Sequence, residues 1–247
     1  MNVYKPSMDS YHLKFLIYGP PGVGKTTLAA SACAVEQMGE VLYINVEGGS
    51  LALGDPSVYG SNTAPDVVDF ESFPDLGVIY TYLLGGEHNY KTVIVDSLSE
   101  LSRYCLDYVI AEKIKRGSAK NRDQDDVFLE DYGTMTKQMR RVVRKFRDLP
   151  LNVIFITHDS PNDTTDNNSK IGPGLTNSLR ESVIGYVDVM GYMYVSEVKE
   201  NDETRSVRRL LTSPVGKFTA KDRSPGQKLG TIMDNPTMTD IYNRITQ

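Results

Sequence analysis

The sequence predicts one α/β domain in which a mostly parallel sheet is flanked by helices and followed by a C-terminal antiparallel hairpin. Apolar runs of strand length alternate with helical patterns over most of the chain, as is typical of parallel sheets. Two β-rich segments near the C-terminus follow each other directly, which predicts the hairpin. A length of 247 residues suits one domain, so we expect a single domain over 1–247 with its core at about 13–225.

The first half of the chain is expected to supply three strands and two helices. Short apolar runs bounded by turn residues predict buried strands, and apolar residues at helical spacing predict helices. The segment 48–73 is rich in Gly, Ser, Pro and Asp, so we expect a loop there. In order, we expect a strand at 14–18, a helix at 25–38, a strand at 41–46, a helix at 74–84 and a strand at 92–95.

The second half is expected to add two long helices, one buried strand and the hairpin. The charged segment 116–131 separates the two helices, and the polar loop 159–177 precedes the hairpin. After the hairpin the pattern is irregular until a short C-terminal helix. In order, we expect helices at 99–115 and 132–148, a strand at 152–157, hairpin strands at 188–198 and 205–212, and a helix near 239–245.

A glycine-rich loop lies between the first expected strand and the first expected helix. Its form is G-x-x-x-x-G-K-[ST], and this context is the one that phosphate-binding loops occupy. Glycines let backbone N–H groups turn inward around phosphate oxygens, Lys25 can reach the β- and γ-phosphates, and Thr26 can ligate Mg²⁺. We therefore expect ATP with Mg²⁺. The expected nucleotide-binding residues are Gly19, Pro20, Pro21, Gly22, Val23, Gly24, Lys25, Thr26 and Thr27.

Two acidic residues end neighbouring strands and complete the expected catalytic site. Asp96 follows the apolar run TVIV, and such a carboxylate at the carboxyl edge of the sheet is expected to hold Mg²⁺ together with Thr26. Glu47 follows VLYINV on the same edge, where a carboxylate can orient and deprotonate the attacking water. The sequence therefore predicts an ATPase with Glu47 as the general base.

Composition excludes several other classes. The formal net charge is −5, so bulk charge does not favour DNA binding, although a local basic track is still compatible with it. The chain has no apolar run of membrane-spanning length and its N-terminus lacks a signal-peptide pattern. We expect a cytoplasmic protein with no membrane partner.

Several segments of the chain form a recognisable set: GPPGVGKTTLA, VIVDSLSEL, NVIFITH, Gly172-Pro173-Gly174-Leu175 before SLRESVIGYVDVMGYM, and GKFTAKDR. The residue after Asp96 is Ser97, whereas ring-forming AAA+ ATPases usually carry Glu there. The set resembles the RecA family and, more specifically, phage-encoded RecA-like nucleotide-binding proteins, often described as phage AAA-domain proteins. The resemblance implies a RecA-like P-loop NTPase core, and some of these proteins act as ATP-stimulated single-strand annealing proteins in phage recombination. It would place the protein in the host cell cytoplasm.

The resemblance also implies roles for residues outside the phosphate loop. His158 lies where RecA-like proteins have a polar residue that senses the γ-phosphate. In that group, basic residues from the next protomer complete the ATP site, and Lys221 and Arg223 match that region better than Lys217. We therefore expect self-association, as a homo-oligomer or short filament, with turnover that depends on assembly.

Two loops match, by position, the loops with which RecA-like proteins hold single-stranded DNA. Lysine and arginine side chains there would pair with phosphates and would read no sequence. The first loop covers about 114–131 and the second 159–177. The expected DNA-binding residues are Lys115, Arg116, Lys120, Arg122 and Lys170.

The sequence leaves other functions open. A loader or adaptor that uses nucleotide as a switch and contacts single-strand-binding or replication proteins would have nearly the same sequence. A P-loop small-molecule kinase is a further alternative, against which stand the absence of an Arg-rich lid segment and the position of Glu47. The function we expect first is ATP-dependent binding of single-stranded DNA in phage recombination or annealing.

Overall fold

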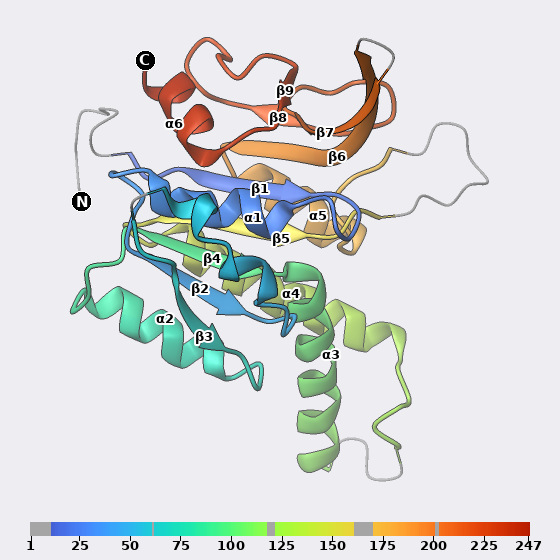
Figure 1. The fold of residues 1–247 in the computed structure, drawn as a ribbon. Helices are drawn as coiled ribbons and strands as arrows, with labels where there is room; N and C mark the ends of the chain where they lie inside the picture. Colours follow the sequence, from blue (N-terminus) through green and yellow to red (C-terminus); the bar gives the residue numbers. More distant parts are fainter. Residues whose placement is uncertain (1–10, 61, 118–121, 161–169, 201–202) are drawn as a thin grey trace.

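A computed structural model describes residues 11–60, 62–117, 122–160, 170–200 and 203–247. In this part of the chain the strands form one sheet with the order β3-β2-β4-β5-β1-β6-β7-β9, and β8 pairs with β6 (Figure 1). The strands from β3 to β6 in this order run parallel, whereas β7, β8 and β9 are antiparallel to their neighbours. The predicted fold class is confirmed. The strands are β1 Lys14–Tyr18, β2 Val41–Asn45, β3 Asp66–Asp69, β4 Thr92–Asp96, β5 Asn152–Thr157, β6 Val189–Glu200, β7 Glu203–Leu211, β8 Lys221–Asp222 and β9 Ile232–Asp234.

Helices cover both faces of the sheet. One face packs against α2 (Asp75–Gly85), α3 (Leu98–Lys115), α4 (Leu129–Arg147) and α5 (Asn177–Tyr186). The other face packs against α1 (Lys25–Ala30), the 3₁₀ turn η2 (Ser31–Ala34) and α6 (Met238–Thr246). Figure 1 also shows that α3 and the start of α4 project well beyond the sheet.

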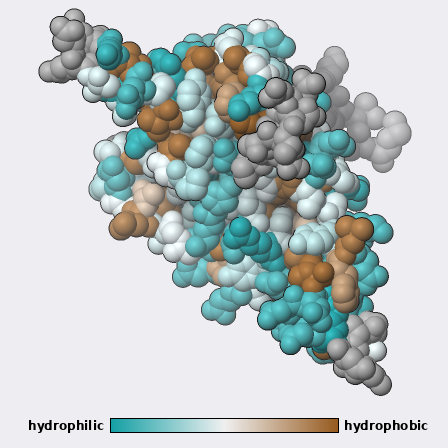
Figure 2. All heavy atoms as spheres, turned by 90° about the vertical axis from the view of Figure 1, so that its right-hand side faces the viewer, coloured by the Kyte–Doolittle hydropathy of each residue, from teal (hydrophilic) through white to brown (hydrophobic). Residues whose placement is uncertain are grey.

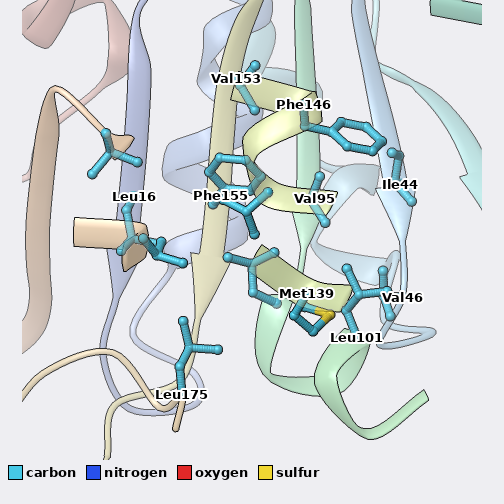
Figure 3. Close-up of a cluster of buried hydrophobic side chains, with 14 of the residues drawn as sticks. Leu16, Ile44, Val46, Val95, Leu101, Met139, Phe146, Val153, Phe155 and Leu175 are labelled. Carbon is cyan, nitrogen blue, oxygen red and sulfur yellow. The ribbon is translucent and has the colours of Figure 1, made fainter. Parts of the chain in front are cut away.

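Strand residues alternate between the two cores because successive side chains of a strand point to opposite faces. Leu16 and Phe155 belong to the core under α4, whereas Ile17 and Ile156 belong to the core under α1. Figure 3 shows the first core, in which Phe146 and Met139 of α4 lie over the sheet. Phe155 is 1% exposed, so a change to Ala is expected to cost about 3–5 kcal/mol.

The first helix is shorter than the sequence pattern predicted. The expected helix at 25–38 was wrong in its second half, because α-helical geometry ends at Ala30 and a 3₁₀ turn follows. Residues from distant parts of the chain form hydrogen bonds with this segment. The Asn62 amide donates to the carbonyl of Cys33 at 2.6 Å, and the Ser31 hydroxyl accepts from the Met238 amide at 2.8 Å.

The segment 48–73 is more regular than predicted. It contains two 3₁₀ turns, η3 (Leu51–Gly54) and η4 (Pro56–Tyr59), and the edge strand β3. Strand β3 has the sequence DVVD and its side chains are mostly exposed. Its backbone pairs with β2, so this strand rests on pairing rather than on an apolar pattern that the sequence could reveal.

Further elements were missed or misplaced in the C-terminal half. Helix α5 and the short strands β8 and β9 were not expected, and α4 begins at Leu129 rather than at 132. The Asp131 carboxylate accepts from the Phe128 backbone amide at 2.8 Å, which fixes the earlier helix start. No helix in the described segments is long and apolar enough to cross a membrane.

Candidate functional site

Four parallel strands deliver the predicted site residues to one edge of the sheet. The registers place Asn45 beside Asp96, Asp96 beside Ile156, and Tyr18 beside Thr157. The residues that follow these strand ends are therefore neighbours in space, although they come from four separate segments of the chain. This is the edge at which ligands bind in open α/β sheets.

The phosphate loop has a backbone that requires glycine. Gly22 and Gly24 have φ values of 75° and 99°, in the left-handed region that glycine adopts without strain. At Gly19 a Cβ atom would lie 2.1 Å from the carbonyl oxygen of Met193, so strand β6 leaves no space for a side chain. Val23 is buried in the core under α1 and anchors the loop. The loop thus forms a fixed cradle whose backbone N–H groups can surround an anion.

Lys25 lies buried beneath this loop. Its ammonium donates to the carbonyls of Gly19 at 2.9 Å and Pro20 at 2.8 Å. Burial lowers the pKa of Lys25, while the nearby carboxylates of Asp96 and Glu47 favour the charged form. A phosphate group can replace the two carbonyls as the partner of this ammonium.

Thr26 and Asp96 meet as the magnesium hypothesis requires. The Thr26 hydroxyl donates to Asp96 Oδ2 at 2.7 Å, and the buried hydroxyl of Tyr43 donates to the same oxygen at 2.7 Å. Burial raises the pKa of Asp96, and these two donated hydrogen bonds oppose the rise. A hydroxyl and a carboxylate in contact are hard oxygen donors of the kind that Mg²⁺ shares with phosphate and water, so these residues fit that ion.

Glu47 lies beside this pair and is held by two partners. The Ser97 hydroxyl donates to Glu47 Oε1, and His158 Nε2 lies 2.9 Å from the same oxygen. The Glu47 and His158 side chains are each about one third exposed, with values of 33% and 35%. The carboxylate is therefore accessible at the mouth of the site, in a position where a water molecule could reach it.

His158 also connects the site to the second predicted DNA loop. Its backbone amide donates to the Ser99 hydroxyl at 3.1 Å, and its carbonyl accepts from the Gly174 amide at 2.7 Å. Within the described residues, His158 Nδ1 is buried without a hydrogen-bond partner. The backbone of His158 is therefore joined directly to the segment that contains Gly174.

The sequence patterns missed three residues of this site. Tyr43 faces Asp96 from β2, Ser97 binds Glu47, and the Asp159 carboxylate adds to the negative charge around Lys25. Tyr43 reads in the sequence as one more apolar strand residue, so only the packed structure reveals its contact. Ser97 follows Asp96 and Asp159 follows His158 in the sequence, and this adjacency could have indicated that they belong to the site.

Lys221 and Arg223 lie away from this site within the same chain. Strand β8 pairs with the beginning of β6, at the edge where the parallel strands start. The Lys221 ammonium donates to the carbonyls of Ile184 at 2.5 Å and of Val187, at the end of α5. Arg223 is exposed. Their action on a neighbouring subunit stays a prediction, and for Lys221 it would require breaking two hydrogen bonds.

The predicted DNA-binding residues fall into three groups. Lys115, Arg116 and Lys170 are exposed, as a phosphate contact requires, although Arg116 also pairs with Glu112 at 2.9 Å. Arg122 is a correction: its side chain is 5% exposed and pairs with Asp131 at 2.5 Å, and its guanidinium lies 4.2 Å from the centroid of the Phe128 ring. Arg122 thus holds the start of α4 instead of facing solvent. Lys120 lies outside the described residues.

Comparison with known proteins adds one family. A family model described as an AAA domain matches residues 12–224. No curated protein matches the chain in a sequence search. The matched residues include the whole phosphate loop, Glu47, Asp96 and His158.

Proposed function

The chain belongs to the AAA-domain family and is accordingly a nucleotide-binding P-loop ATPase domain, and we propose that it hydrolyses Mg²⁺-bound ATP and uses this cycle to bind and release single-stranded DNA. The observation that carries the ATPase part is the contact between Thr26 and Asp96 with Glu47 beside it. Thr26 comes from the first turn of α1, whereas Asp96 ends β4 and Glu47 follows β2, and the three meet beside the phosphate loop. The arrangement has the parts that phosphoryl transfer to water needs.

In the proposed reaction each residue has one task. Lys25 leaves the carbonyls of Gly19 and Pro20 and binds the β- and γ-phosphates. Thr26 and Asp96 would hold Mg²⁺, which supplies charge neutralisation on the phosphates when bound. Glu47 takes a proton from a water molecule as its oxygen attacks the γ-phosphorus, and the bond to the β–γ bridging oxygen breaks.

His158 is proposed to sense the γ-phosphate. It contacts Glu47 at 2.9 Å while its carbonyl is bonded to Gly174. A γ-phosphate that draws the imidazole away from Glu47 would free the general base and shift the loop that follows β5. This link supports a coupling between the nucleotide and the second DNA loop.

The DNA part of the proposal rests on exposed cations and on the likeness to RecA. Lys115 and Arg116 lie at the end of α3, on the projecting part of the molecule, and Lys170 lies in the loop after β5 (Figure 1). The same likeness motivates self-association, with Arg223 as the more available trans cation because it is exposed. We propose phage recombination or annealing as the context.

The test measures ATP turnover and DNA affinity with and without a single-stranded oligonucleotide of one base type. We expect DNA to stimulate turnover, and DNA affinity to rise in the presence of ATP. A double change of Lys115 and Arg116 to Ala should reduce the salt dependence of DNA affinity by about 0.7 per lost phosphate contact. Unaltered turnover with DNA and no DNA binding in ATP would refute the DNA part and leave the ATPase intact.

A matched control exists on the same helix. Arg103 and Arg116 are both 75% exposed, and each pairs with a glutamate one turn away. Arg103 lies near the start of α3 and Arg116 at its end. Arg103→Ala should therefore leave the salt dependence of DNA affinity unaltered. An equal effect of both changes would show that any loss of positive charge on α3 weakens DNA binding, and that the end of α3 has no special role.

One observation favours an adaptor as the second candidate. Figure 2 shows brown, hydrophobic spheres on the surface of the molecule. Around the start of α4 the exposed large apolar or aromatic side chains are Val127, Phe128, Leu129 and Tyr132, with exposures of 42–88%. Such a patch is typical of a protein-binding surface. If DNA does not bind, loss of replication-protein binding on Leu129→Asp would favour a nucleotide-switched loader or adaptor.

A further inference from the structure

A cavity of about 280 Å³ adjoins the outer side of the phosphate loop. It lies between α1 and the hairpin strands and is also lined by residues of two short segments, 55–58 and 235–237. Gly24 and Thr27 line it from the phosphate loop and α1, and Val58, Met193 and Arg208 complete the lining. The cavity is therefore continuous with the place where the proposed phosphates bind, and no residue of the proposed hydrolysis mechanism other than the loop borders it.

Arg208 reaches from β7 onto the phosphate loop. A Cβ atom built on Gly24 would lie 3.1 Å from Arg208 Nε and 3.2 Å from Arg208 Cδ, so the arginine side chain covers this glycine. The next residue, Arg209, pairs with Asp234 at 2.8 Å. No carboxylate in the described part of the chain pairs with Arg208. A cation placed beside a phosphate loop without an acidic partner is available to an anionic ligand.

The wall that carries Arg208 is fixed by specific hydrogen bonds. The Arg208 amide donates to Asn235 Oδ1 at 3.2 Å, and the Asn235 amide donates to the Arg208 carbonyl at 2.7 Å. Three residues later, the Met238 amide donates to the Ser31 hydroxyl at 2.8 Å. The C-terminal segment is thus held both to β7 and to the turn η2 that follows α1. These contacts fix the position of the cavity wall.

We infer that this cavity receives the nucleoside part of the nucleotide and that Arg208, acting within the same chain, contacts the phosphate nearest the nucleoside. The inference rests on the proposed function and specifies its ligand further. Its volume is near the lower end of the range for small-molecule sites, sufficient for a base with its ribose. Val58 and Met193 offer apolar surface to the faces of the base, and the Asp55 carboxylate can accept from ribose hydroxyls.

Binding of ATP and of inorganic tripolyphosphate tests this assignment, because tripolyphosphate has the phosphates and lacks the nucleoside. Ser57→Trp introduces a large side chain from the exposed rim of the cavity. It should weaken ATP binding about tenfold or more and leave tripolyphosphate binding unaltered. Arg208→Ala should weaken both ligands about tenfold, the loss expected for one charge-assisted hydrogen bond.

Control variants distinguish an effect on the nucleoside cavity from misfolding and from failure of the proposed ATPase function. Arg209→Ala removes the same charge from the adjacent residue of the strand and should leave both affinities unaltered. Ser57→Tyr, with a smaller ring, and thermal unfolding of each variant show that the effects do not come from misfolding. Normal ATP binding by a folded Ser57→Trp variant, or normal binding of both ligands by Arg208→Ala, would overturn the inference alone. A wild-type chain that binds neither ligand would overturn the proposed function and this inference with it.

Discussion

The two edges of the parallel sheet use buried polar groups in different ways. At the edge where strands begin, the Lys14 ammonium donates to the backbone carbonyls of Leu149 and Leu151, and the Lys14 amide donates to Asp188 at 2.8 Å. At the edge where strands end, Thr26, Tyr43 and Asp96 bind one another through their side chains. The first set completes the backbone hydrogen bonding of the fold, whereas the second can exchange its partners for those of a ligand.

Two lysines show how far local chemistry alone can mislead. The Lys25 and Lys221 ammonium groups each donate to two backbone carbonyls, and burial lowers the pKa of both. The carboxylates of Asp96 and Glu47 favour the charged form of Lys25, whereas at Lys221 the Arg223 cation lowers the pKa further and Asp188 opposes this. The surroundings of each lysine, and not its burial, therefore distinguish a ligand-binding role from a structural one.

The largest effect is expected at the edge where strands end. Lys25→Ala should abolish ATP turnover and greatly weaken nucleotide binding, because the only buried cation beneath the described phosphate loop is lost. Lys91, at the opposite edge, donates to the carbonyl of Glu36 at 2.8 Å and provides the matched control. Steady-state turnover and equilibrium ATP binding measure the difference, and equal losses for Lys91→Ala would remove the contrast between the edges.

Glu47→Gln should separate binding from chemistry. Without a general base, turnover should fall about 10²- to 10⁴-fold while ATP affinity is kept. Asp69→Asn is the control, since Asp69 ends the adjacent strand β3 and accepts from Asn45 Nδ2 at 3.1 Å. Single-turnover hydrolysis and ATP binding measured together decide the matter, and normal turnover in Glu47→Gln would refute its assignment as the base.

Lys221→Met should affect stability instead of turnover. The carbonyls of Ile184 and Val187 lose their donor, at a cost of about 1 kcal/mol in the free energy of unfolding. Burial lowers the pKa of Lys221 to about 8 from its usual 10.5, so above pH 8 the unfolded chain holds a proton that the folded chain has released. The free energy of unfolding of the wild type should therefore rise from about pH 8 to 10.5, and this contribution should be absent in the variant.

Denaturant unfolding at several pH values measures this difference. Lys14 contributes a rise of the same sign in both proteins, since burial lowers its pKa to about 8 as well, so only the difference between the curves counts. Unchanged stability together with lost turnover would contradict the structural role and favour action of Lys221 on a neighbouring subunit.

For Tyr43→Phe we expect a change in the Mg²⁺ requirement and not a loss of turnover at saturating Mg²⁺. Loss of the hydrogen bond to Asp96 should raise the pKa of that carboxyl further, so the Mg²⁺ concentration for half-maximal turnover should increase about tenfold. The increase should be larger at acidic pH, where more of Asp96 is protonated. Tyr59→Phe is the control, because the Tyr59 hydroxyl is buried and donates to the Leu53 carbonyl at 2.6 Å, away from Asp96. An unaltered Mg²⁺ requirement in Tyr43→Phe would show that the contact does not tune the site.

The sequence by itself determined the parallel sheet and the phosphate loop. Period-two alternation and apolar strand runs fix which residues can be buried together, and the loop needs glycine at positions such as Gly22 whatever surrounds it. Asp96 and Glu47 could be predicted as site residues for a similar reason, since parallel strands end at a common edge. Each of these inferences depends on local patterns that the chain carries in consecutive residues.

Only the tertiary structure decided which charged and polar side chains are free to act. Arg122 and Arg116 look alike in the sequence, yet the Asp131 carboxylate and the Phe128 ring hold Arg122 inside the fold. Strand β3, with the sequence DVVD, exists because β2 offers a backbone edge, and Arg208 reaches the phosphate loop because β7 lies beside β6. Burial and long-range contacts set these outcomes, and they depend on residues far away in the chain.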